Sequence, residues 1–182
     1  MLKIIGLSLA GLLVALTALV YWGSGPWLWP VKGLWADHLA STFADRGPGE
    51  TVFYGASNFR LWGSMEEDLY PYRVQNHGIG GSVDADLMEY ADVLLYPFEP
   101  KVVFIQTGSN DLVLGLSVDE VKANKARMYE QFQSRLPEAT FVVMSGLPLP
   151  GRDADWGGIQ EVNGFLADYC VNHDRMVFID AT

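Results

Sequence analysis

Two continuous apolar runs most constrain what this chain can fold into. They are "VVFI" within residues 101–107 and "FVVM" within residues 140–145. Neither run shows the apolar and polar alternation of a strand that has one face in water, so both indicate strands covered on both faces. Helices on either side of a parallel sheet provide such cover. We therefore predict an α/β fold: a three-layer α/β/α sandwich around a parallel five-stranded sheet of the flavodoxin-like type.

The rest of the chain alternates between strand and helix patterns, with Gly and Pro between them. The predicted strands cover residues 51–55, 73–76, 101–107, 140–145 and 175–180. The predicted helices are a short one after Ser57 and longer ones at residues 83–96, 117–136 and 157–172. A lead-in helix is expected at residues 31–45.

The amino-terminal segment predicts a membrane anchor. Residues 4–22 carry no charge, and roughly 20 helical residues cross a hydrocarbon layer of about 30 Å. The aromatic residues that follow are typical of a membrane interface, and Lys3 favours a cytoplasmic amino terminus. We expect an anchor or signal at 1–24, a juxtamembrane lead-in helix at 25–48 and a domain at 49–182 outside the cytoplasm, in the periplasm or beyond. Cleavage of the segment as a signal peptide, giving a secreted protein, stays open.

The charge argues against a nucleic-acid partner, and the cysteine content excludes an intrachain disulfide and a cysteine metal site. The net charge is -10 and the sequence contains no Lys/Arg block, so we expect no nucleic-acid partner. The single cysteine, Cys170, excludes an intrachain disulfide and a cysteine cluster for a metal. We expect no cofactor and no metal.

Small and polar residues follow the first three strands as "GASN", "NHGIGGS" and "GSND". Ligand sites in open parallel sheets gather at the carboxyl ends of the strands. There Ser57 is a candidate nucleophile, and its N–H, the N–H of Gly81 and the amide of Asn110 are candidate donors to an oxyanion, each worth about 3 kcal/mol. The alternative is that Ser57 and Asn110 cap local structure and that the glycines serve turns.

These motifs resemble a known family. "GAS" ending at Ser57, "NHGIGG" ending at Gly81 and "GSND" containing Asn110 are similar to the first three blocks of the SGNH hydrolases, the GDSL-like esterases and lipases. The resemblance spans roughly residues 48–182, and "GAS" departs from the usual Gly-Asp-Ser. It implies the SGNH fold and a serine esterase acting on acyl esters of a glycan, a lipid or a small metabolite. It also implies Ser57 as nucleophile, Gly81 and Asn110 in the oxyanion hole, and Asp111 as support for the loop.

The histidine base of that family lies in an Asp-x-x-His block after the last strand, and no residue of this sequence matches the block. Of His38, His77 and His173, only His77 follows a strand on the predicted site edge, and we favour a structural role for it. We therefore expect the sequence to be a fragment that is inactive as given. The alternative is a non-catalytic SGNH-like binding or scaffolding module at the membrane. A nucleotide binder ranks last, because Val83 occupies the third glycine position of G-x-G-x-x-G.

Overall fold

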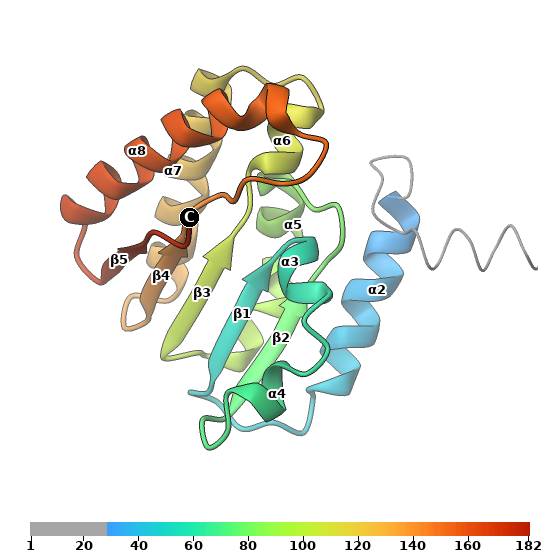
Figure 1. The fold of residues 1–182 in the computed structure, drawn as a ribbon. Coiled ribbons are helices and arrows are strands. Elements are labelled where there is room, and N and C mark those ends of the chain that lie inside the picture. Colours follow the sequence, from blue (N-terminus) through green and yellow to red (C-terminus); the bar gives the residue numbers. More distant parts are fainter. Residues whose placement is uncertain (1–28) are drawn as a thin grey trace, which may run out of the picture.

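A computed structural model describes residues 29–182, with side chains from residue 32 onward. It contains a parallel five-stranded sheet in the order β2-β1-β3-β4-β5 (Figure 1). This is the flavodoxin-like order that the sequence predicts. The predicted anchor at 1–24 lies outside the described residues. None of the helices in the described part of the chain is long and apolar enough to cross a membrane.

The predicted strands and long helices are all present, with ends shifted by a few residues. The strands are β1 (Thr51–Gly55), β2 (Val74–Gly78), β3 (Val102–Gln106), β4 (Thr140–Met144) and β5 (Met176–Ile179). The longer helices are α2 (Trp29–Thr42), α5 (Asp84–Leu94), α7 (Val118–Arg135) and α8 (Trp156–Val171). Shorter helices are α3 (Ser57–Arg60), α4 (Met65–Asp68), α6 (Ser109–Val113), η2 (Tyr96–Phe98) and η3 (Asp153–Asp155).

Most of the core lies on one face of the sheet. Residues from α2, α5, α7 and α8 pack there against inward-facing residues of the strands, such as Tyr54, Val103 and Phe141. On the other face, α3 and α4 contribute Phe59 and Met65 to a smaller core over β1 and β2. The strands place alternate residues on the two faces, so each strand contributes to both cores.

The two faces are covered unequally. On the face of α3 and α4, Val177 and Ile179 of β5 are 47% and 39% exposed. Phe104 and Met144, from the continuous apolar runs, are only half-buried. The prediction of cover on both faces therefore holds for β1 and β2 and only in part for the other half of the sheet.

The lead-in helix α2 belongs to the packed domain. Ala36, Leu39 and Phe43 are buried in the main core. Lys32 and Asp86, both buried, form an ion pair of 2.6 Å that joins α2 to the first turn of α5. The helix is therefore fixed to the rest of the domain through apolar contacts and through one buried charge pair with α5.

Candidate active site

Ser57 begins α3 directly beyond the end of β1. The residue at the N-cap position is Ala56, and no side chain caps this helix. The hydroxyl of the half-buried Ser57 has no hydrogen-bond partner among residues 29–182. The capping alternative for Ser57 is therefore wrong, and its hydroxyl is left for another role.

Glycines let α3 lie directly on the ends of the strands. A Cβ at Gly55 would lie 2.5 Å from the carbonyl oxygen of Gln106, and one at Gly78 would collide with the backbone nitrogen of Arg60. At Gly80 a Cβ would collide with the Arg60 guanidinium. The glycines of "GAS" and "NHGIGG" therefore allow α3, which carries Ser57, to pack closely against the ends of β1 and β2.

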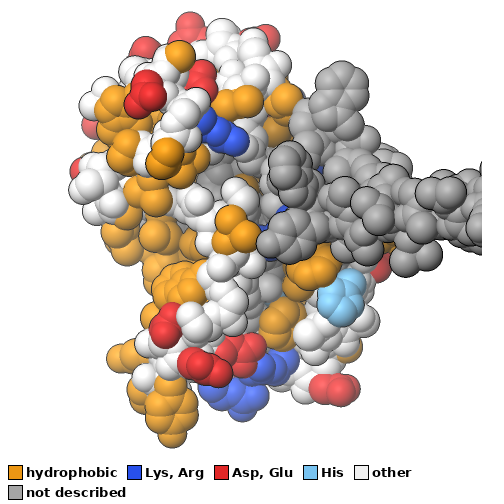
Figure 2. All heavy atoms as spheres, turned by 45° about the vertical axis from the view of Figure 1, so that its right-hand side comes forward, with side chains coloured by type: hydrophobic (Ala, Val, Ile, Leu, Met, Phe, Trp, Pro, Cys, Tyr) orange, Lys and Arg blue, Asp and Glu red, His pale blue; other side chains and the backbone are white. Residues whose placement is uncertain are grey.

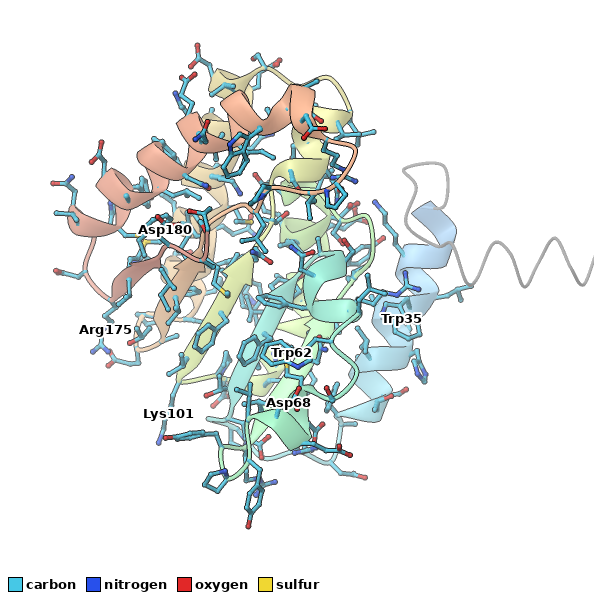
Figure 3. The ribbon with its side chains drawn as sticks, in the orientation of Figure 1. Trp35, Trp62, Asp68, Lys101, Arg175 and Asp180 are labelled. Carbon is cyan, nitrogen blue, oxygen red and sulfur yellow. The ribbon has the colours of Figure 1, made fainter. Side chains whose placement is uncertain are left out.

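Helix α2 also contacts this part of the structure. The indole nitrogen of Trp35 donates to the carbonyl oxygen of Gly78 over 3.1 Å, and the Arg60 guanidinium lies 5.7 Å from the Trp35 ring centre. Figure 3 shows Trp35 on α2, on the side that faces α3. The position of α3 is thus set by two contacts: the glycines at the strand ends, on which it packs, and Trp35 of α2.

The structure brings the loops of Gly81 and Asn110 together. Gly81 adopts a positive φ of 73°, a conformation that favours glycine. The Nδ2 of Asn110 donates to the carbonyl oxygen of Ser82 over 2.9 Å, and Nη1 of Arg152 donates to its Oδ1 over 3.1 Å. These two bonds fix the orientation of the Asn110 amide, which keeps a second N–H hydrogen for a ligand.

Arg152 was missed by the sequence reasoning as a contact of the site. It lies in the loop between β4 and α8, where the segment "GLPLPGRDADW" follows the fourth strand. A basic residue in the loop that follows a strand at the site edge was the available signal.

No histidine side chain in the described part of the chain forms a hydrogen bond with Ser57. His77 is fully buried, its Nδ1 donates to the carbonyl oxygen of Leu94 over 2.5 Å, and its ring packs against Phe43 and Phe98. Burial lowers the pKa of His77 to about 4. His38 is exposed on α2, and His173 stacks on Tyr169 before β5, at the opposite edge of the sheet. The structural role of His77 is thereby confirmed.

Two further features of the described residues bear on ligands. They contain no group of three or more His, Cys, Asp or Glu side chains arranged to hold a metal ion. On the face in Figure 2, acidic and basic side chains are interspersed and no continuous basic surface is visible.

Together, the fold and this edge define an α/β protein of the SGNH type, with Ser, Gly and Asn blocks at successive strand ends. Residues 32–182 match the GDSL-like Lipase/Acylhydrolase family, and the chain belongs to that family. A search of curated proteins found no match.

Solved structures share the fold. A Streptococcus pneumonia structure named for platelet activating factor aligns over 85% of this chain and 76% of its own, with 19% identity and a TM-score of 0.73. A GDSL-like lipase from Bacteroides thetaiotaomicron aligns over 80% and 77%, with 21% identity and a TM-score of 0.65. The SGNH-hydrolase family esterase AlinE4 aligns over 74% and 77%, with 22% identity and a TM-score of 0.58.

Proposed function

We propose that the protein is a serine esterase whose nucleophile is Ser57. The observation that carries the proposal is the pairing of a Ser57 hydroxyl without a structural partner and an Asn110 amide fixed by Ser82 and Arg152, both at the carboxyl edge of the sheet. The backbone N–H groups of Ser57 and Gly81 and the amide of Asn110 form the oxyanion hole. Membership of the GDSL-like Lipase/Acylhydrolase family supports this assignment.

The reaction proceeds through an acyl-enzyme. Ser57 Oγ loses its proton to a base and bonds to the ester carbonyl carbon, and the oxyanion that forms is held by the three donors. The carbon–oxygen bond to the alcohol then breaks, and the alcohol leaves with a proton. Water attacks the acyl carbon, releases the acid and restores the Ser57 hydroxyl. None of the three histidines is placed to act as this base.

The substrate that we propose is an acyl ester of a glycan, a lipid or a small metabolite, met at a membrane outside the cytoplasm. The uncharged run at residues 4–22 supports an anchor. Fractionation with amino-terminal sequencing tests this placement. A membrane-bound chain that begins at Met1 supports the anchor, and a soluble chain that begins near residue 25 indicates cleavage.

A second candidate is a non-catalytic module that binds esters or carboxylates at the same strand-end site. The observation that favours this alternative is that no histidine side chain of the described residues bonds Ser57: His77 is buried on the Leu94 carbonyl, and His173 bonds the Tyr169 carbonyl before β5. It retains the oxyanion donors as ligand contacts, with no chemistry at Ser57.

The deciding experiment measures hydrolysis of p-nitrophenyl acetate by protein expressed from the complete reading frame. Ser57→Ala should lower the turnover rate by about 10³-fold or more while the chain stays folded. Ser64→Ala is the matched control, because Ser64 is an exposed serine outside the site whose side chain bonds Asp68. Equal turnover in wild type and Ser57→Ala excludes Ser57 as nucleophile, and no turnover in either supports the binding module.

A further inference from the structure

A buried charge cluster lies directly behind the two loops of the candidate site. Lys125 of α7 is fully buried, and its Nζ lies 3.2 Å from Oδ1 of Asp84. The same Nζ donates to the carbonyl oxygen of Thr107 over 3.0 Å. Asp111 completes the cluster, because its Oδ1 accepts the backbone N–H of Asp84 over 3.3 Å.

This cluster is poorly explained as a device for stability. Lys125 lies on the face of α7 that buries Val121, Met128 and Phe132, where an apolar side chain of similar length would pack without loss of hydration. The cluster holds two carboxylates for one ammonium. Oδ2 of Asp84 and Oδ2 of Asp111 are both buried without a hydrogen-bond partner in the described part of the chain. Polar groups held in this way call for a role other than packing.

The cluster bridges the segments that carry the proposed oxyanion donors. Asp84 is the first residue of α5, three residues after Gly81, and Asp111 directly follows Asn110. Lys125 therefore touches one segment at Asp84 and the other at Thr107. The bond from Asn110 Nδ2 to the carbonyl oxygen of Ser82 joins the same two segments closer to the site.

Gly108 makes this approach possible. It has a φ of 108°, and a Cβ there would lie 2.6 Å from Cε and 2.8 Å from Nζ of Lys125. Distances below 3.0 Å are too short for real Cβ contacts. The glycine of "GSND" thus gives the Lys125 ammonium its place under the loop.

We propose that Lys125, Asp84 and Asp111 are positioning residues that hold the Gly81 and Asn110 segments at the spacing an oxyanion requires. This inference rests on the proposed esterase function. The three residues act through the segments that they tie together and do not touch the substrate.

The charge state of the cluster offers a specific signature. Burial and the charge of Asp84 raise the pKa of Asp111 to about 7, while Lys125 and the backbone N–H of Asp84 oppose the rise. Burial raises the pKa of the Tyr129 phenol on α7, and the charge of Asp84 adds to this rise. Ionisation of Asp111 therefore changes the net charge behind Asn110 near neutral pH, and loss of Lys125 should move that change to higher pH.

The test replaces Lys125 by Met in the full chain and compares kinetics with nuclear magnetic resonance of the Asn110 side-chain amide. We expect kcat on p-nitrophenyl acetate to fall about tenfold or more with KM within about twofold, since donors misplaced for the oxyanion weaken the transition state rather than the ground state. We also expect the Asn110 signals to titrate at a higher pH than in wild type. Lys125→Arg should restore both properties in large part. Lys122→Met is the matched control, because Lys122 lies on the same helix and pairs with Glu161 outside the cluster.

Unchanged kcat together with an unchanged Asn110 titration in a folded Lys125→Met variant overturns the proposal. If that variant does not fold, Asp111→Asn keeps an oxygen for the Asp84 N–H and removes the charge. The Asn110 titration near neutral pH should then vanish, and its persistence overturns the proposal. The magnetic resonance measurement needs no turnover, so the two proposals can fail separately. Absence of Ser57-dependent hydrolysis refutes the esterase function, and the Asn110 signals still decide the positioning role.

Discussion

The buried His77 makes a defined prediction about stability against pH. Burial lowers its pKa from 6.5 to about 4, so the folded protein holds His77 neutral where the unfolded chain takes up a proton. Above pH 6.5 His77 is neutral in both states and costs the folded protein nothing. As the pH falls toward 4, protonation of His77 in the unfolded chain lowers the free energy of unfolding. Each pKa unit corresponds to about 1.4 kcal/mol, so the loss is about 3 kcal/mol of unfolding free energy. The physical cause is that the ring is buried between Phe43 and Phe98, where a positive charge would lose its hydration.

The assay is urea unfolding of the full chain in detergent micelles, followed by tryptophan fluorescence between pH 4 and 7.5, with His77→Phe as the test variant and His38→Phe as the control. Asp111 contributes the opposite trend, since a carboxyl pKa raised to about 7 gives stability that is lost as the pH rises toward 7. The informative quantity is therefore the difference between wild type and His77→Phe, in which the Asp111 contribution cancels. This difference should grow by about 3 kcal/mol from pH 4 to 6.5. A difference that stays constant across this range refutes a neutral, enclosed His77.

Two further predictions concern the packing around the site. Gly78→Ala forces a Cβ against the Arg60 backbone, so it should displace α3 and lower Ser57-dependent turnover by about tenfold or more. The control is Gly63→Ala, whose Cβ meets nothing within 4 Å and should leave turnover unchanged. Equal turnover rates in the two variants contradict the close packing of α3 on Gly78. Lys32→Met leaves Asp86 buried without its cation and should cost about 3–5 kcal/mol in urea unfolding, whereas a loss below about 1 kcal/mol means that Asp86 does not need this partner.

The order of elements was predictable because it depends on local patterns. Apolar runs and helical spacing located the five strands and the long helices, and the glycines between them marked the site edge. The short helix α6 was missed because its five residues carry no periodic pattern. The partial cover of Phe104 was also missed, since a run apolar on both faces does not reveal which neighbours cover each face.

The contacts that organise the site depended on tertiary structure. Arg152 meets Asn110 across 42 positions of sequence, a pairing that no local pattern specifies. Lys125 left a weak signal, because it interrupts an otherwise apolar helical face between Val121 and Met128. A charged residue on such a face indicates a buried partner, but the sequence does not say which carboxylate it meets.

The segment that carries Gly81 is held from two sides by buried ion pairs. Asp84 meets Lys125 of α7 over 3.2 Å, and Asp86, two residues later, meets Lys32 of α2 over 2.6 Å. Asp86 also accepts the backbone N–H of Val83 over 2.9 Å, so the pair with α2 reaches directly into the turn that leads from Gly81 into α5. The lead-in helix therefore helps to fix the site, through Asp86 here and through Trp35 on the Gly78 carbonyl.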